Sequence, residues 1–444
     1  MRKTITRQIE CFPVAIEHEY AKELEAVSDI LDRQANIAEL VARDIRISER
    51  GRTGLNADQV IRAYIIRQMK GFSYRDLSFH IADSTSFQRF CRMSEFTASH
   101  SASTYQKLFK QISADTLEQI NMVVLEYARQ LGIEDGQKMR YDCTVVETNI
   151  HQPNDSSLLY DTVRTLVRFM FKAAENCSVP AFQDRQRAAK RRMLQIHRAR
   201  KKDKRRQVYS ELIEITQQTV DEARLVAAVA RGHASAAGNI FLFWVVGQLL
   251  HFAKLGERVL DQSVSRVLLD ETYPAKEKIF SIFEEHTDII VKEPRETEYG
   301  HKVCLGVGKA LVTDVTIEDG NPADSTLAIG MVERHKGIFG KVPRQVAFDG
   351  GFASLKNLGE LKEKGIEDVA FHKKRGLKVP DMARSSAVYR ALNRFRAGIE
   401  GIISFLKRCM GMRRCNWRGL ASFKAYVWAS AVTANLLILA RMKT

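Results

Sequence analysis

The chain has 444 residues, of which 45% are hydrophobic and 27% are charged, as in ordinary soluble globular proteins. This length suggests roughly two to four domains and leaves ample room for a packed core. Lys and Arg number 69 against 53 Asp and Glu, so the net charge is +16 and the expected partner is a polyanion: nucleic acid, an anionic membrane or an acidic protein.

Cysteines and apolar segments narrow the class of protein further. The seven cysteines form no CxxC pair, which favours reduced thiols in a cytosolic protein over a disulfide framework or a zinc site. They are Cys11, Cys91, Cys143, Cys177, Cys304, Cys409 and Cys415. The N-terminus lacks an apolar signal core, and the longest apolar run, residues 240–250, is too short to span a bilayer. We therefore expect a soluble, intracellular protein.

Residues 1–135 are predicted to be all-helical. Apolar residues recur at helical spacing over residues 24–42 and 56–69, and Gly71 ends the second segment. The sequence Ser73-Tyr-Arg-Asp76 then has the spacing of a capping box, which predicts that a new helix starts at once. Short helices joined by tight turns are typical of a helix-turn-helix unit, although a generic helical bundle explains the spacing equally well.

The period changes to two over residues 138–148, where Met139, Tyr141 and Cys143 alternate with polar neighbours. This pattern predicts a strand with one apolar face. Residues 156–290 then return to helical character.

A strongly basic run lies inside this helical stretch, over residues 185–206. It contains no Gly or Pro, and Asp203 is its only acid, so one long solvated helix is predicted. The functional interpretation is contact with the DNA backbone, where each neutralised phosphate releases a counterion. The candidate contact residues are Lys190, Arg191, Arg192, Lys201 and Lys202. The alternative is a solvated helix face with no ligand.

Residues 299–371 alternate between strands and helices. A hairpin is expected over residues 302–317 around Gly308-Lys309, followed by a helix over 325–335, a strand over 346–348, a helix over 355–364 and a strand over 369–371. Such alternation predicts an α/β layer with mixed strand directions, and the helical stretch of residues 156–290 interrupts it as an insertion.

Two acidic residues accompany these strands. Asp142 lies on the polar face of the first strand, and Asp349 ends a short apolar strand directly before Gly350-Gly351, where the chain can turn sharply. Because a buried charge is costly unless it is paired or bound to a metal, an acid at the end of a buried strand points to a site. A solvated loop acid or a helix cap is the alternative for each residue.

A third acid lies on a helix predicted over residues 386–407. Phe395, Ile399, Ile402 and Leu406 form its apolar stripe. Arg396, Glu400 and Lys407 share another face and can point into a common cleft. A surface ion pair between Arg396 and Glu400 is the alternative.

Taken together, Asp142, Asp349 and Glu400 predict a metal-dependent phosphoryl-transfer site. Converging carboxylates can hold two Mg²⁺ ions, which activate a nucleophile and stabilise the leaving oxygen of an in-line displacement. Arg396 and Lys407 beside them would attract the phosphates that the acids alone repel. An acidic cluster in a strongly basic chain is typical of a metal nuclease or a polynucleotidyl transferase.

Three stretches of the chain resemble the DDE-class transposases of bacterial insertion sequences. The stretch from Tyr141-Asp-Cys-Thr-Val-Val to Asp155 is similar to the segment of the family's first catalytic Asp, and Val346-Ala-Phe-Asp-Gly-Gly-Phe352 to that of the second. Arg396-x3-Glu400-x6-Lys407 resembles the family's Arg–Glu–Lys signature, except that Asn393 stands where the family usually has Tyr. Residues 71–90 and the tail from Arg413 also resemble the family's terminal segments.

The resemblance implies an RNase H-like α/β fold: a mixed sheet with flanking helices, an all-helical N-terminal domain before it and a helical insertion inside it. The predicted domains are a DNA-binding N-terminal domain at 1–135, a catalytic domain at 136–160 and 291–410, a basic insertion at 161–290, and a C-terminal helix at 411–444 that packs on the core. That last helix is expected to be amphipathic.

The resemblance also implies an activity and its partners. Expected are binding to terminal inverted repeats, strand cleavage and strand transfer into target DNA, with two Mg²⁺ ions per active site, Mn²⁺ as a substitute, and a homodimer or higher oligomer on DNA. The location would be cytoplasmic and nucleoid-associated. Thr144 and Asn149 are candidate accessory residues near Asp142, and Asp155 is expected to be a helix N-cap.

Two other functions fit the same residues, and a third alternative, a basic RNA-binding or ribosomal factor, predicts no acidic cluster and no need for a divalent ion. One is a related DNA nuclease that cleaves without strand transfer. The other is a DNA-binding regulator whose catalytic domain has decayed, against which the intact acids Asp142, Asp349 and Glu400 argue.

Overall fold

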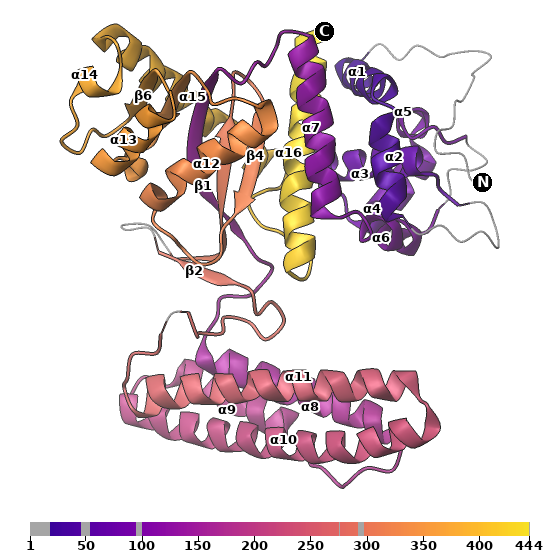
Figure 1. The fold of residues 1–444 in the computed structure, drawn as a ribbon. Coiled ribbons are helices and arrows are strands. Elements are labelled where there is room, and N and C mark those ends of the chain that lie inside the picture. Colours follow the sequence, from indigo (N-terminus) through magenta and orange to yellow (C-terminus); the bar gives the residue numbers. More distant parts are fainter. Residues whose placement is uncertain (1–17, 46–53, 95–99, 275, 292–296, 444) are drawn as a thin grey trace. The chain divides into compact units, whose positions relative to one another are not determined.

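The computed structural model describes residues 18–45, 54–94, 100–274, 276–291 and 297–443. These residues fall into two compact units (Figure 1). We call Met1–Thr148 with Gly300–Thr444 the sheet unit, and Asn149–Tyr299 the helical unit. The start of the predicted N-terminal domain and Cys11 lie outside the described residues. The functional division into four domains stays a prediction.

The N-terminal part of the sheet unit is helical throughout its described residues, as predicted. Its helices are α1 (Glu19–Arg33), α2 (Asn36–Asp44), α3 (Ala57–Lys70), α4 (Tyr74–Asp83), α5 (Thr85–Phe90), α6 (Ala102–Phe109) and α7 (Ala114–Gln130). Ser73 and Asp76 form the predicted capping box of α4, and Gly71 ends α3 in the left-handed conformation with φ of 65°. The apolar pattern over residues 24–42 is split between α1 and α2 at Gln34.

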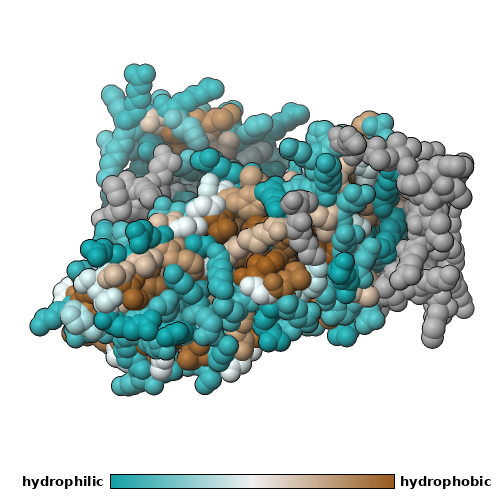
Figure 2. All heavy atoms as spheres, turned by 90° about the horizontal axis from the view of Figure 1, so that it is seen from above, coloured by the Kyte–Doolittle hydropathy of each residue, from teal (hydrophilic) through white to brown (hydrophobic). Residues whose placement is uncertain are grey.

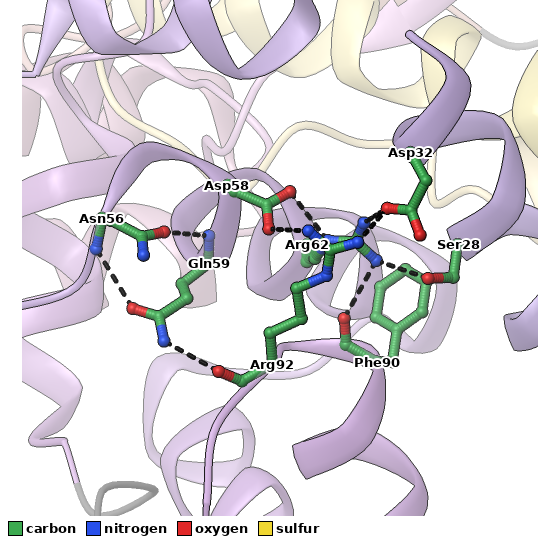
Figure 3. A network of polar contacts seen from close by, with 8 residues as sticks. All are labelled: Ser28, Asp32, Asn56, Asp58, Gln59, Arg62, Phe90 and Arg92. Carbon is green, nitrogen blue, oxygen red and sulfur yellow. Dashed lines mark hydrogen bonds and ion pairs between the residues drawn. The ribbon is translucent and has the colours of Figure 1, made fainter. Parts of the chain in front are cut away.

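A buried arginine joins three of these helices (Figure 3). The Arg62 side chain on α3 is fully buried and donates to Asp58 at 2.8 Å, to Asp32 on α1 at 2.5 Å and to the Ser28 hydroxyl at 2.7 Å. The same guanidinium donates to the Phe90 carbonyl at the end of α5. Arg92 pairs with both aspartates, so each carboxylate contacts two cations. The cluster is balanced in charge.

The sheet has parallel and antiparallel strand pairs. Its strands are β1 (Lys138–Glu147), β3 (Glu298–Val307), β4 (Val312–Ile317), β5 (Gln345–Phe348) and β6 (Asp368–Phe371), and the short β2 (Asp288–Ile290) precedes β3 in the chain. The order is β3-β1-β5-β6, with β4 paired to β3. β1 is antiparallel to β3 and parallel to β5, and β5 is parallel to β6. This is the mixed sheet that the sequence predicted.

Helices cover both faces of this sheet. They are α12 (Asp324–Phe339), α13 (Leu355–Glu363), α14 (Val379–Met382), α15 (Ser386–Arg408) and α16 (Leu420–Lys443). Because side chains alternate along a strand, Met139 and Tyr141 face the core that contains α12 and α13, whereas Arg140 and Asp142 face α15. The β1 strand is therefore the element that carries a polar residue to α15.

The last helix, α16, differs from its prediction. It is buried on nearly every side, between α7, α1 and β4, so the predicted amphipathic pattern is wrong. The amide of Asn435 accepts from the backbone N–H of Val312 at 2.9 Å and donates to the carbonyl of the same residue at 2.8 Å. These bonds fix α16 against the β3–β4 hairpin, which satisfies a polar group in the core.

The helical unit is a bundle of long helices. They are α8 (Asp155–Ala174), α9 (Gln186–Arg198), α10 (Lys202–Ala237) and α11 (Ile240–Ser263), followed by a short π-helix, η1 (Val264–Leu268). The basic run predicted as one helix is broken between α9 and α10, so that prediction is wrong. The N-cap of α8 is Asn154, not Asp155 as predicted. Asp155 is buried and binds Arg266 at 2.8 Å and Gln262 at 2.9 Å, which ties α8 to the end of α11.

Two helices among the described residues are long and apolar enough to cross a membrane, at residues 240–268 and 420–442. A core helix satisfies the same criterion, and 89% of the most hydrophobic 18-residue window of the second segment is buried inside the protein. Hydrophilic side chains cover most of the coloured surface in Figure 2, with smaller hydrophobic patches between them.

The described cysteines are all free thiols. Although they are scattered in the sequence, Cys143 and Cys304 are directly paired across β1 and β3, with their Sγ atoms 2.7 Å apart. The hydrogen bond with the Cys304 thiol and, after it, burial raise the pKa of Cys143, so this thiol stays protonated at neutral pH.

Candidate active site

Asp142 reaches the site from the middle of β1. Its side chain is 17% exposed, and its carboxylate accepts from the Cys143 backbone N–H at 2.8 Å. Burial raises the pKa of Asp142 from 3.8 to about 6, although the nearby Arg396 guanidinium opposes the shift. Because burial makes this carboxylate costly to ionise, any cation that binds beside Asp142 stabilises its ionised form.

Asp349 reaches the same place from the end of β5. The strand stops at Phe348, and residues 350–352 form a single 3-10 turn, so the Asp349 carboxylate stands at the carboxyl edge of the sheet. The glycines are required by space, because a Cβ on Gly350 would lie 2.6 Å from the Lys373 side chain. A Cβ on Gly351 would lie 2.5 Å from the Asp324 carboxylate. The sequence predicted a sharp turn here. The close approach of Lys373 and Asp324 explains why both positions of this turn are glycine.

Glu400 and Arg396 come from α15, which packs across β1, β5 and β6. Ile399 and Leu406 are buried on the helix face that meets the core, as the predicted stripe requires. One turn separates Arg396 from Glu400, so both side chains project toward the sheet edge. Glu400 is 68% exposed, whereas Arg396 is 9% exposed.

The Arg396 guanidinium brings the three acids together. Its Nη2 atom lies 3.3 Å from Asp142 Oδ2 and 3.0 Å from Asp349 Oδ1, and its Nη1 atom lies 3.2 Å from Glu400 Oε1. Three residues that are far apart in the sequence thus share one cation. The surface ion pair between Arg396 and Glu400 is present, but it is one part of a larger cluster.

The donor set suits a hard divalent cation, because it consists of carboxylate oxygens only. As they stand, however, no three acidic, His or Cys side chains in the described part of the chain are close enough together to hold a metal ion. The centre of the three carboxylates is taken by a guanidinium. The residues therefore fit a metal in chemistry and in net charge, and a metal would replace the Arg396 cation there.

The other predicted residues of this site differ in their surroundings. Lys407 is half-buried, about two turns beyond Glu400 on α15. Thr144 is buried on β1, on the same strand face as Asp142. Asn149 is exposed and belongs to the helical unit. Asn393, in place of the family's Tyr, donates to the Tyr389 carbonyl within α15.

A fourth acid, Asp324, was not predicted as part of the site. It is the first residue of α12, forms an ion pair with the buried Lys302, and helps to raise the pKa of Asp142. Lys302 also donates to the Pro322 carbonyl at 2.6 Å, which fixes the start of α12. An acid in the first turn of a helix is common, so nothing in the sequence distinguishes Asp324 from an ordinary helix-terminal residue.

A basic cleft lies in the helical unit, where α9 ends and α10 begins. It has a volume of about 700 Å³, and six Arg and Lys residues line it with one acid, Glu211. The six are Arg191, Arg192, Arg198, Arg200, Lys201 and Lys204. Arg192 binds Glu211 at 2.7 Å and Lys202 binds Asp270 at 3.0 Å. Lys190, Arg191 and Lys201 are exposed and form no ion pair with a residue that the structure describes.

Family models match two parts of the chain. The transposase DDE domain matches residues 286–436, which contain Asp349, Arg396 and Glu400, and the transposase domain (DUF772) matches residues 16–111. The chain belongs to the DDE-class transposases of insertion sequences. No curated protein and no solved structure matches it.

The fold agrees with the matched DDE domain, although one candidate acid lies outside both matched ranges. The α/β fold with its mixed sheet and N-terminal helices is that of an RNase H-like DDE domain. Such a domain implies an enzyme that cleaves and transfers DNA, and the family generally uses divalent metal ions. Asp142 and the helical unit up to residue 285 lie outside both matched ranges, so the assignment of Asp142 depends on its contact with Arg396.

Proposed function

We propose that the transposase cleaves DNA at the ends of its element and joins the freed 3′ ends to target DNA by two-metal-ion phosphoryl transfer. The observation that carries this proposal is the convergence of Asp142, Asp349 and Glu400 on one guanidinium. Three carboxylates around a single positive charge leave an excess of negative charge that suits divalent cations.

The chain's own residues take distinct parts in this reaction. Asp142 and Asp349 would bind both Mg²⁺ or Mn²⁺ ions, and Glu400 would complete one of the two positions. Bound ions would supply a Lewis acid for the leaving oxygen and an activated water or 3′-hydroxyl. Arg396 and Lys407 would bind backbone phosphates through their positive charges. The Arg396 guanidinium can bind two phosphate oxygens at once, whereas the Lys407 ammonium acts as a point charge. Thr144 is buried beside Asp142 and would hold the strand geometry.

Contacts with DNA outside the active site are proposed for two regions. The basic cleft has six cations around one acid, which suits the phosphate backbone of duplex DNA. The N-terminal helices would hold the terminal repeats. A homodimer or higher oligomer would pair the two element ends, and the protein would act in the cytoplasm on nucleoid DNA.

Cleavage of a labelled duplex that carries the element's own end tests the proposal. Wild-type protein should cut it with Mg²⁺ and not with EDTA, and Glu400→Gln should not cut it. Glu363→Gln changes a glutamate at the end of α13 and serves as the control that cuts normally. Equal cutting by Glu400→Gln and the wild type would falsify the assignment of the third acid.

Strand transfer separates the proposed function from the alternatives. A precleaved end mixed with target plasmid should give joined products with a transposase and none with a nuclease. A complete lack of cutting by the wild type, with tight binding to the same end, would instead support a DNA-binding regulator.

A further inference from the structure

The active-site cluster contains fewer cationic side chains than carboxylates. Asp142, Asp349 and Glu400 carry three negative charges when ionised, and Arg396 is the one cation in an ion pair with them among the described residues. Like charges held this close repel each other. The guanidinium is therefore the group that lets the three carboxylates share one place in the metal-free protein.

The contacts of Arg396 are loose for a buried arginine. Its three ion-pair distances are 3.0–3.3 Å, whereas charge-assisted N–H···O bonds are typically about 2.7–2.9 Å long. Its Nε atom is buried and has no hydrogen-bond partner. A buried donor without a partner costs free energy, so this position of the side chain is one from which it can be displaced.

We propose that Arg396 is an internal stand-in for the divalent cations, and that it couples metal binding to DNA binding. Without DNA, the guanidinium occupies the centre of the three carboxylates and competes with metal. When a backbone phosphate enters, it binds the guanidinium and draws it from the acids, which then accept metal. The proposal rests on the proposed function, because it assumes that these acids are the metal ligands.

Two surrounding features suit such an exchange. Glu400 is 68% exposed, so its carboxylate can follow either Arg396 or a metal without a large cost in packing. The Arg396 stem is anchored on α15, where the backbone one residue away accepts a 2.8 Å bond from Arg140 on β1. The helix can therefore stay in place while only the side chain moves. By linkage, the factor by which DNA raises metal affinity equals the factor by which metal raises DNA affinity.

The test is a Mn²⁺ titration, followed by electron paramagnetic resonance of the free ion, on full-length wild type and Arg396→Gln without DNA. Arg396→Gln should bind Mn²⁺ roughly tenfold more tightly, a size that is typical of coupling between sites. The control is Arg394→Gln, which removes an exposed arginine from the same helix and should bind like the wild type. The double variant Asp349→Asn/Arg396→Gln should lose the gain.

A second titration includes a short mixed-sequence duplex. DNA should raise the Mn²⁺ affinity of the wild type and leave that of Arg396→Gln unchanged, with Asp349→Asn on the same DNA as the correction for ions bound by the duplex. Thermal unfolding checks that each variant is folded. If Arg396→Gln is unfolded, Arg396→Lys takes its place, since one ammonium cannot contact three carboxylates in the same geometry and should give part of the gain.

The outcomes separate the inference from the proposed function. If Asp349→Asn weakens Mn²⁺ binding but Arg396→Gln binds Mn²⁺ no more tightly than the wild type, the stand-in role is wrong and the metal site remains. If Asp349→Asn weakens Mn²⁺ binding neither in the wild type nor in Arg396→Gln, the proposed metal site itself is wrong. The inference is then overturned with it.

Discussion

The protein contains two clusters in which a buried arginine meets carboxylates, and they are built in opposite ways. Around Arg62, two aspartates face two arginines, and the guanidinium also binds a hydroxyl and a carbonyl. Around Arg396, three carboxylates face one arginine, and the Nε atom has no partner. The first cluster is neutral and satisfied, whereas the second is acidic and incomplete.

The difference indicates what each cluster is for. A network with balanced charges and satisfied donors does not attract a charged ligand. The Arg62 cluster therefore serves to hold α1, α3 and the end of α5 together. A cluster with excess negative charge is stabilised by a further cation. The Arg396 cluster therefore has the properties of a binding site, although a simple count of ion pairs would make the two clusters look alike.

The largest expected effect is on DNA cleavage. Asp349→Asn should lower the cleavage rate by about 1000-fold or more, since metal ions contribute several kcal/mol to such reactions. Its free energy of unfolding should change little or rise, because one of three like charges is removed. Single-turnover cleavage and urea unfolding measure the two effects, with the exposed Asp381 changed to Asn as the control.

The next effect is on stability. Arg62→Met should lower the free energy of unfolding by about 3–5 kcal/mol, because it leaves the buried Asp58 without its main cation. Denaturant unfolding measures this loss. Arg129→Met breaks an exposed ion pair on α7 and should change stability little. A similar small change in both variants would show that the Arg62 cluster is not structural.

A smaller effect concerns pH in the metal-free protein. Burial raises the pKa of Asp142 to about 6, so the folded state binds this proton more tightly than the unfolded state does. The contribution of Asp142 to stability is therefore fully present below about pH 4 and falls by up to roughly 3 kcal/mol as pH rises through 6. Unfolding in EDTA should show this slope in the wild type and not in Asp142→Asn. Equal slopes would mean that Asp142 titrates normally.

The smallest effect concerns the basic cleft of the helical unit. Lys201→Gln should weaken DNA binding equally for all sequences and lower the slope of log affinity against log salt by about one. Fluorescence anisotropy over a range of salt concentrations measures the slope. Lys254→Gln removes an exposed lysine of α11 as the control. An unchanged slope for Lys201→Gln would remove the cleft from the DNA-binding surface.

The sequence predicted much of the fold because its signals were local. Alternation over β1, the turn after Asp349 and the apolar stripe of α15 each follow from the residues themselves. The break at residues 199–201 could not be predicted, because it contains no Gly or Pro. The chain turns there because α9 packs against α10, which is a tertiary contact. The burial of α16 depends on α1, α7 and β4, which are all far from it in the sequence.

The sequence predicted which residues form the proposed site, but it did not predict how they are arranged. The spacing of Arg396 and Glu400 placed them on one helix face, yet nothing local indicated that the guanidinium would contact all three acids. Asp324 entered the site because α12 starts beside Gly351 and Lys302, which is a tertiary contact. The charged residues of the proposed site were thus visible in the sequence, whereas the balance of their charges required the fold.

The central claim is that the unbalanced acidic cluster is a divalent-metal site. Thermal unfolding of the wild type and of Asp349→Asn, each with and without Mg²⁺, tests it most directly, because an ion that binds only the folded state raises the unfolding temperature. We predict that Mg²⁺ raises the unfolding temperature of the wild type and leaves that of Asp349→Asn unchanged. An equal rise in both proteins, or none in the wild type, would contradict the account.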